Sequence, residues 1–281
     1  MVSAKDIVVK PITSQAANAL IKRVHYSGKI VNNSTLHLGA YLNDKLEGVM
    51  SFGSPLDKRK VLPLVEGTSW NGMLELNRMA FSDRLPKNSE SRCLAVAFRL
   101  IKKHYPHIDW ILSFSDGTQC GDGTIYRASG FVLTGIKANN SIWRAPNGES
   151  FAETALRPGI GGSKAIAKAE TISRTSMVEG KHLAASGGKS SMQRFKDAGW
   201  EPIPGYQLRY IYFLNKDARQ RLTVPIIPFS KIDEIGASMY KGKSIKRDTK
   251  ATTNDQLVGG GAIPTITLHS SCIASKKSSE A

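Results

Sequence analysis

The sequence predicts an α/β (α+β) fold in which helices flank a mixed central sheet. Apolar runs of strand length alternate with segments whose apolar residues recur at helical spacing, and polar turn residues separate them. The resulting order is β-α-β-β-β-α-β-α-β, which is typical of one sheet covered by helices. A hydrophobic content of 41% over 281 residues is enough for the core of one large domain or two small ones.

The first elements follow from apolar periodicity and one turn signal. Thr13 or Ser14 can cap a helix with one apolar face, and Asn43-Asp44 marks the turn of a hairpin. The predicted elements are a strand at Ile7–Val9, a helix at Ser14–Val24, and hairpin strands at Leu36–Leu42 and Leu46–Phe52.

The remaining elements surround one long amphipathic helix. Asn88 or Ser89 is expected to cap it, and Glu90 lies in its first turn, which suits the helix dipole. The predicted elements are a strand at Met73–Met79 that ends in Asn77-Arg78, the helix at Asn88–Tyr105, a buried strand at Trp110–Phe114, a short helix at Thr124–Ser129 and strands at Phe131–Ile136 and Gln207–Leu214.

The balance of charge indicates a polyanionic partner. Lys and Arg number 39 against 23 Asp and Glu, so the net charge is +16 and the sequence pI is about 9.8. Nucleic acid is the simplest such partner, and solubility alone, an acidic coenzyme or lipid headgroups are the alternatives. The sequence shows no apolar run of membrane-spanning length, no export leader and no paired cysteines, so we expect a protein of a reducing cytosol.

The chain is expected to divide into a domain at residues 1–241 and a flexible tail at residues 242–281. A basic insertion at about residues 138–204 precedes the last strand of the sheet. Its part from Gly161 to Trp200 has few apolar residues, so it is either a basic arm that orders on nucleic acid or a pair of surface helices without a role. The tail is polar and contains a run of glycines at Gly259–Gly261.

Several sequence blocks occur together in a known family. They are KPITSQAANALIKRVHYSGK at residues 10–29, SFGSPLDKRK at 51–60, ELNRMA, PKNSES, SFSDGTQCGDGTIYRASGF, SIWRAP at 141–146 and, more weakly, GYQLRYIYFL at 205–214. In this order they resemble the Mom family, the adenine-modifying proteins of phage Mu and its relatives. The resemblance covers most of residues 10–146 and implies a GCN5-related N-acyltransferase-like fold, which has the element order given above.

The resemblance also implies an activity. Such an enzyme is a transferase that converts adenine in double-stranded phage DNA to its N6-carbamoylmethyl derivative, which protects the DNA from host restriction. It would act in the cytoplasm of the bacterial host, with no membrane association, on double-stranded DNA, with tRNA as a further candidate partner and a dimer as one candidate state. The alternative is a non-enzymatic, basic nucleic-acid-binding protein on a degenerate acyltransferase fold.

Polar side chains at the ends of apolar elements are the candidate site residues. By residue type, His25 can act as a base or a metal ligand, Arg78 can clamp phosphate or carboxylate, and Asp116 can be an acid–base group or a turn cap. Each also has a plain structural interpretation as a cap, a surface charge or a packed side chain. The resemblance implies that the catalytic set is His25, Tyr26, Arg78, Asp116 and Tyr126, with Asn77 and Ser115 as substrate-binding neighbours.

The sequence leaves two candidates for the donor of the transferred group. The loop before the long helix, Arg84–Ser89, lacks the glycines with which acyltransferases of this fold bind coenzyme A, although a helix N-terminus still favours an anion. The candidates are acetyl-CoA and an aminoacyl-tRNA such as glycyl-tRNA. The resemblance adds iron as a candidate cofactor, with His25 and Asp116 as its ligands.

Contacts to the DNA backbone are expected from basic side chains. Lys58, Arg59 and Lys60 follow Pro55 in a predicted loop and are the first candidates for phosphate contact. Arg92, Arg99 and Lys103 share one face of the long helix. Trp70, Trp143 and Phe52 can stack on a base flipped out of the duplex, although aromatic residues of this kind are more often part of the core.

Overall fold

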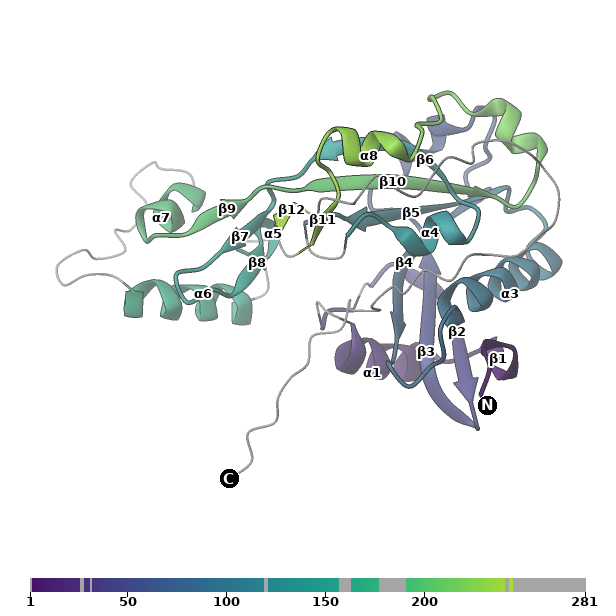
Figure 1. The fold of residues 1–281 in the computed structure, drawn as a ribbon, viewed down its shortest axis with the longest axis horizontal. Coiled ribbons are helices and arrows are strands. Elements are labelled where there is room, and N and C mark those ends of the chain that lie inside the picture. Colours follow the sequence, from purple (N-terminus) through teal and green to yellow (C-terminus); the bar gives the residue numbers. More distant parts are fainter. Residues whose placement is uncertain are drawn as a thin grey trace.

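A seven-stranded sheet in the order β1-β2-β3-β4-β5-β10-β6 lies at the centre of the computed structural model. The structure describes residues 2–25, 28–30, 32–118, 121–156, 163–176, 191–240 and 243–244. Neighbouring strands of the sheet pair antiparallel, except for β4 and β5, which are parallel (Figure 1). The strands are β1 Val8–Pro11, β2 Ser34–Leu42, β3 Lys45–Gly53, β4 Met73–Phe81, β5 Trp110–Asp116, β6 Val132–Ala138 and β10 Tyr206–Phe213.

Helices and short turns cover this sheet and connect its strands. The α-helices are α1 Ser14–Val24, α2 Lys58–Val61, α3 Ser89–His104, α4 Thr124–Ala128 and α8 Ser230–Glu234. The 3₁₀ turns are η1 Ala4–Asp6, η2 Leu62–Leu64 and η3 Asp217–Arg221, and a two-stranded ribbon follows with β11 Met239–Tyr240 and β12 Lys243–Ser244. The predicted order of elements and the mixed sheet flanked by helices are confirmed.

Local sequence accounts for several of these boundaries. The side chain of Thr13 accepts the backbone N–H of Ala16 at 3.3 Å, so α1 begins where the predicted cap stands. Asn43 and Asp44 both have positive φ, at 47° and 60°, which is the backbone that a tight turn between β2 and β3 needs. The hairpin and its turn were therefore readable from the sequence.

Three local expectations were wrong. Asn88 precedes α3 but has a left-handed backbone, with φ at 66°, and its side chain makes no capping bond, while Ser89 donates its hydroxyl to the carbonyl of Pro86. Lys58–Lys60 form one helical turn rather than a loop, because the Asp57 side chain accepts the Lys60 amide and starts α2. Strand β4 continues through Asn77 and Arg78 to Phe81, because Met79, Ala80 and Phe81 pair with β3.

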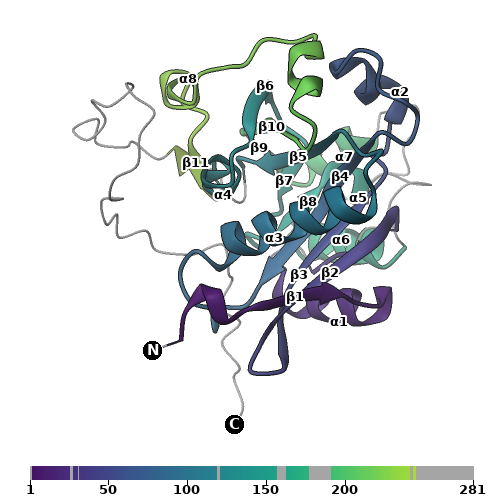
Figure 2. The same cartoon turned by 90° about the vertical axis from the view of Figure 1, so that its right-hand side faces the viewer.

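The two faces of the sheet carry separate hydrophobic clusters. One face packs under α3 and α4, where Phe52, Leu76, Leu94, Phe98 and Tyr210 belong to the main core. On the other face α1 packs on β3 and β4, and a separate cluster lies under η2 and η3 on β4, β5 and β10. Figure 2 shows α3 crossing in front of the strands, with α1 near the β1 edge. The second face is therefore covered by two separate layers, the α1 layer and the α2–η2–η3 layer.

The insertion forms a small lobe with its own core, in the part that the structure describes. The lobe contains β7 Ile142–Arg144, β8 Ser150–Ala152, α5 Glu153–Leu156, α6 Ser163–Ser176, α7 Ser191–Asp197 and β9 Glu201–Ile203, and Figure 1 shows it extending beyond one end of β10. Trp143, Phe195 and Trp200 are buried together, with Phe151 packed against them. Among the described residues, Gly161–Trp200 contains two helices, α6 and α7, as the second of the two alternatives expected. They are not purely surface helices, because Ile172 and Phe195 are buried in the core of the lobe.

The lobe joins the sheet beside the end of β5. Tyr206 pairs with Ala138 and Gln207 pairs with Asp116, and the Asn139 amide donates to the Gly205 carbonyl at 2.7 Å. The chain therefore enters and leaves the lobe at one point. Residues 245–281, most of the expected flexible tail, lie outside the described residues. Within the described part, no helix is long and apolar enough to cross a membrane.

Replacing Trp200 with alanine should unfold the lobe and leave the sheet intact. Trp200 is 2% exposed, its ring lies 5.1 Å from that of Phe195, and its indole N–H donates to Ser173 at 2.9 Å. Loss of a buried aromatic costs about 3–5 kcal/mol, which exceeds what so small a core can supply. Hydrogen exchange should show protection lost in α6 and β7–β9 and kept in β3–β5.

Trp70→Ala is the matched control for this experiment. Trp70 is 57% exposed, so its loss should change the free energy of unfolding by no more than about 0.5 kcal/mol. Uniform loss of protection across lobe and sheet in Trp200→Ala would show instead that the two unfold as one unit.

Candidate active site

The sheet opens between β4 and β5. The two parallel strands pair at Met73–Trp110, Leu74–Ile111 and Glu75–Leu112, and no further pairs follow, although β4 runs on to Phe81 and β5 to Asp116. Beyond Glu75, β4 stays with β3 and β5 stays with β10. Backbone groups and side chains at this opening are available to a ligand in a way that fully paired strands do not allow.

A β-bulge in β4 lies at the start of the opening. Arg78 pairs with Ser51 and Leu76 pairs with Phe52, so Asn77 is an extra residue without a partner on β3. A bulge bends its strand and re-aims side chains. Because Leu76 and Phe52 belong to the main core, Glu75 and Arg78 both point to the opposite face, the one that carries α1.

Two short rows of polar side chains cross the strands on that face. In the first row His37, Ser51 and Arg78 are cross-strand partners, and His37 Nδ1 lies 2.8 Å from Ser51 Oγ. In the second row Ser34 Oγ donates to Asn77 Oδ1 at 3.0 Å, and the Asn77 side chain hydrogen-bonds the Glu75 carboxyl. His37, Ser51 and Asn77 are buried, so these rows are fixed parts of the protein interior rather than surface groups.

His25 and Arg78 meet at the end of α1. Burial and the positive charge of Arg78 lower the pKa of His25 to about 4, so its imidazole is neutral at neutral pH. Arg78 Nε donates to the Lys29 carbonyl at 3.2 Å, which ties the loop after α1 to β4. The structure thus brings together His25, Asn77 and Arg78 of the expected set. Tyr26 lies outside the described residues.

Asp116 and Ser115 end β5 on the other side of the opening. Alternation along β5 places Asp116 on the same face as Leu112, the partner of Glu75. Its carboxylate accepts the backbone amide of Thr118 at 3.0 Å, which is the turn-capping interaction. Ser115 Oγ donates to the Gly121 carbonyl at 2.9 Å. Both side chains therefore shape the turn that follows β5.

Tyr126 lies on α4, at the opposite face of the sheet. Its ring is 5.2 Å from Tyr210 and 5.2 Å from Phe131, in the main core. Nearby, the Tyr210 hydroxyl donates to the carbonyl of Asp122, and the buried Asp122 carboxylate pairs with Arg127 at 3.2 Å. The structure thus separates Tyr126 from the His25–Arg78 group by the thickness of the sheet.

The basic residues of α2 lie at the edge of the α2–η2–η3 layer. Lys58 Nζ stands 5.0 Å above the ring of Trp70, Lys60 pairs with Asp57 at 2.8 Å, and Arg59 is exposed. Trp70 is exposed, unlike a core residue, whereas Trp143 and Phe52 are buried. Of the three aromatic candidates for base stacking, only Trp70 has its ring at the surface.

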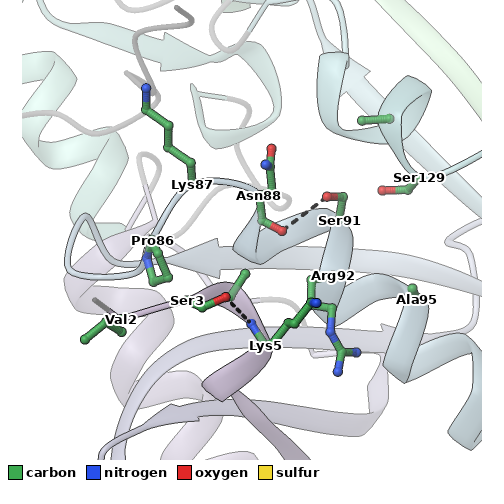
Figure 3. A pocket seen from close by; sticks show the side chains of 12 residues that line it. Val2, Ser3, Lys5, Pro86, Lys87, Asn88, Ser91, Arg92, Ala95 and Ser129 are labelled. Atoms are coloured by element: carbon green, nitrogen blue, oxygen red, sulfur yellow. Dashed lines mark hydrogen bonds between the residues drawn. The ribbon is translucent and has the colours of Figure 1, made fainter. Parts of the chain in front are cut away.

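A cavity of about 740 Å³ lies at the start of α3, on the main-core side (Figure 3). Figure 3 shows residues of η1 on one wall and the first turn of α3 on the other. Lys5, Lys87 and Arg92 line it, together with Asn88 and Ser91. Three cations beside a helix N-terminus suit a phosphate-bearing ligand.

The structure gives no support to the expected iron site. Among the described residues, no group of three or more His, Cys, Asp and Glu side chains could hold a metal ion, so the expected iron ligands His25 and Asp116 gain no third ligand there. Three polar residues of this face were not among the candidates expected from the sequence. They are His37, Ser51 and Glu75. A charged residue inside the apolar strand MLELNRMAF and a histidine inside LHLGAYL were the available signals.

The Mom protein family matches residues 6–231 of the chain. The chain belongs to the Mom protein family. The methylcarbamoylase mom of Escherichia phage Mu is 33% identical over 224 residues, which cover 79% of this chain and 82% of that protein.

Solved structures with partial likeness to this Mom family member are acyltransferases. The match to the ribosomal-protein-S18-alanine N-acetyltransferase of Escherichia coli covers 74% of this chain and 94% of that enzyme, at 8% identity and a TM-score of 0.38. An N-acyl amino acid synthase from uncultured soil microbes covers 47% and 82%, at 18% identity and a TM-score of 0.35.

Glu75→Gln should stabilise the protein at neutral pH. Burial raises the pKa of Glu75 to about 6, against the hydrogen bond from Asn77 and the charge of Arg78. Since the folded pKa lies above the unfolded one, the charged carboxylate destabilises the folded state above pH 6, and this penalty disappears as pH falls to about 4.5. The gain at pH 8 should reach up to about 2 kcal/mol.

Thermal unfolding at several pH values measures this effect. The difference between Glu75→Gln and the parent should be largest at pH 8 and vanish below the unfolded pKa of 4.5. Glu66→Gln, an exposed site, is the control and should show no pH-dependent gain. A loss of stability at every pH would mean that the carboxylate holds the strand in place.

Proposed function

We propose that the protein is a DNA-modifying transferase that converts adenine in double-stranded phage DNA to its N6-carbamoylmethyl derivative and so protects that DNA from host restriction. The observation that carries the proposal is the grouping of His25, Asn77 and Arg78 at the opening between β4 and β5, within the region matched by the Mom family. The name of the phage Mu relative, a methylcarbamoylase, supports the same chemistry.

The face that carries this group suits a nucleic-acid substrate. It is covered by the α1 layer and the α2–η2–η3 layer, and the polar rows lie between the two clusters. Lys58, Arg59 and Lys60 on α2 supply positive charge beside it, on a chain whose net charge is +16. A paired adenine must leave the duplex to reach such a buried group, and exposed Trp70 offers a ring beside the route.

The chemistry of the group fits transfer from an activated acyl-type donor. Arg78 is a fixed cation, held by the Lys29 and Asn77 carbonyls at 3.2 and 3.0 Å, and can stabilise negative charge that develops on a donor carbonyl oxygen. The neutral imidazole of His25 can donate or accept one hydrogen bond without carrying charge. Arg78 and His25 together orient a donor. Neither of them takes the proton of the incoming amine, so another group must accept it.

The donor is proposed to lie across the sheet, with its phosphates at α3. Lys5, Lys87 and Arg92 around the cavity fit the phosphates of acetyl-CoA or the end of an aminoacyl-tRNA such as glycyl-tRNA. Asn88, at the start of α3, has the left-handed backbone that glycine usually supplies. The reactive end of the donor would reach His25 and Arg78 through the opening between β4 and β5.

Replacing the expected catalytic residues should abolish modification without unfolding the protein. His25→Ala, Asp116→Ala and Tyr126→Phe should each lower the modified fraction of adenine by roughly a hundredfold or more, the usual contribution of an acid–base group. The readout is mass spectrometry of nucleosides from plasmid DNA of expressing cells. His107→Ala, an exposed histidine, should leave the modified fraction unchanged.

Unmodified adenine beside soluble, folded wild-type protein would count against the enzyme and favour a non-enzymatic DNA-binding protein. Full activity of Tyr126→Phe would assign that ring to core packing, in line with its contacts to Tyr210 and Phe131.

Neutralising Lys58, Arg59 and Lys60 together should weaken DNA binding and its dependence on salt. Each phosphate contact contributes roughly one unit to the slope of log affinity against log salt, so the slope should flatten by up to about three. Anisotropy titrations with duplex DNA at several salt concentrations measure it. Neutralising Arg99, Lys102 and Lys103 on the exposed side of α3 is the matched control and should leave the slope unchanged. The reverse result would place the DNA on the α3 side.

A further inference from the structure

Glu75 lies where the sheet begins to open, and its carboxyl is hydrogen-bonded to Asn77, a residue expected to bind substrate. It is the last residue of β4 that pairs with β5, and it faces the same side of the sheet as Arg78. We propose that Glu75 is the catalytic base that accepts the proton of the adenine amine during transfer. This role rests on the proposed function and adds a catalytic residue to it.

The position of the carboxyl is fixed from two directions. Asn77, the bulge residue, hydrogen-bonds it, and Asn77 is itself held by the hydroxyl of Ser34 at 3.0 Å. Arg78 lies close enough to act on it electrostatically. A base held in this way needs little reorganisation when a substrate amine arrives.

The other groups on this face are weaker candidates for the base. They are Arg78 on β4, His25 at the end of α1, His37 on β2, Asp116 on β5 and Arg209 on β10, whose guanidinium is hydrogen-bonded to Thr134. Burial lowers the pKa of both histidines, and His37 is bonded to Ser51. Asp116 accepts the amide of Thr118, and the guanidinium of Arg78 is a permanent cation.

The burial of Glu75 is a second observation that favours this assignment. It raises the pKa of Glu75 to about 6, above the usual carboxyl range, so this carboxylate is a stronger base than an exposed one. At neutral pH most of the group is ionised and ready to take a proton. A half-buried carboxylate that destabilises its own fold is the kind of residue expected in a site.

The adenine nitrogen uses its lone pair to form a bond to the activated carbon of an ester or thioester donor. The bond from that carbon to the leaving oxygen or sulfur breaks, and its electron pair stays on the leaving atom. The proton from the nitrogen passes to a Glu75 oxygen and is then released to the leaving group or to water. This step gives an N6-acyl adenine. With a glycyl ester as the donor, that product is an isomer of the N6-carbamoylmethyl derivative, and an internal rearrangement of the glycyl unit, which needs no further reagent, completes the conversion.

The test compares Glu75→Gln and Glu75→Asp with the wild type in extracts of expressing cells. The extract supplies the donor, unmodified plasmid is the acceptor, and modified adenine is measured from pH 5 to 8.5. The wild-type rate should rise with pH through about 6. Glu75→Gln keeps an oxygen for Asn77 but cannot take the proton, so its rate should fall by roughly a hundredfold or more. Glu75→Asp should keep part of the rate and the rise with pH.

Thermal unfolding separates this role from a structural one. Glu75→Gln should be more stable than the wild type at pH 8 and still inactive, a combination that a mere packing role does not produce. Near wild-type activity of Glu75→Gln, or an unchanged rise with pH in that variant, would overturn the assignment. If wild-type extract modifies no adenine, the proposed function fails first, and that outcome is distinct from loss in the variant alone.

Discussion

The site depends on the backbone pairing that β4 and β5 stop making after Glu75 and Leu112. Parallel strands side by side in a sheet normally continue to pair until one of them ends. Here pairing stops after Glu75 and Leu112, and each strand continues with its other neighbour, β3 or β10. The extra residue Asn77 bends β4 at that point, so the opening is built into the register of the sheet. The polar rows, the end of α1 and the turn after β5 are all arranged around this gap.

Charge placement follows from the same geometry. The main core fills one face with apolar side chains, so the polar groups of β2, β3 and β4 collect on the other face, where they satisfy one another. Arg78 joins this face to the loop after α1 through the Lys29 carbonyl. Burial disfavours the charged form of each titratable group. It therefore lowers the pKa of His25 and raises the pKa of Glu75. One environment therefore yields a neutral imidazole and a basic carboxylate, both within electrostatic reach of Arg78.

Periodicity and turn signals were sufficient to predict most of the fold. The bounds of α1, the hairpin of β2 and β3 and the length of α3 follow from local sequence, because α1 has an apolar face and a cap, the hairpin has its turn residues, and α3 has an apolar face. The bulge at Asn77 was not predictable, since it exists only in the register between β3 and β4. The lobe was missed for a similar reason. Trp143 lies far from Phe195 and Trp200 in sequence, and only the tertiary fold shows that they share a core.

Part of the candidate site was also visible beforehand. His25, Asn77 and Arg78 were named from residue type and resemblance, and the structure gathers them. Glu75 escaped notice because a single acidic residue in a strand reads as a solvent-facing position until its neighbours are known. The expected roles of Asp116 and Tyr126 stay predictions, and their contacts add a turn cap and a core ring that any catalytic role must accommodate.

The attachment of the lobe determines which insertions, deletions and exchanges of sequence the chain can tolerate there. Asn139 and Gly205, at its two ends, are hydrogen-bonded neighbours, and β6 and β10 stay paired beneath them. A segment rooted at one point can lengthen, shorten or be exchanged while strand register below it is preserved. Its point of attachment borders Asp116, so variation in the lobe alters the wall next to the candidate site while the strands that hold the candidate residues keep their register.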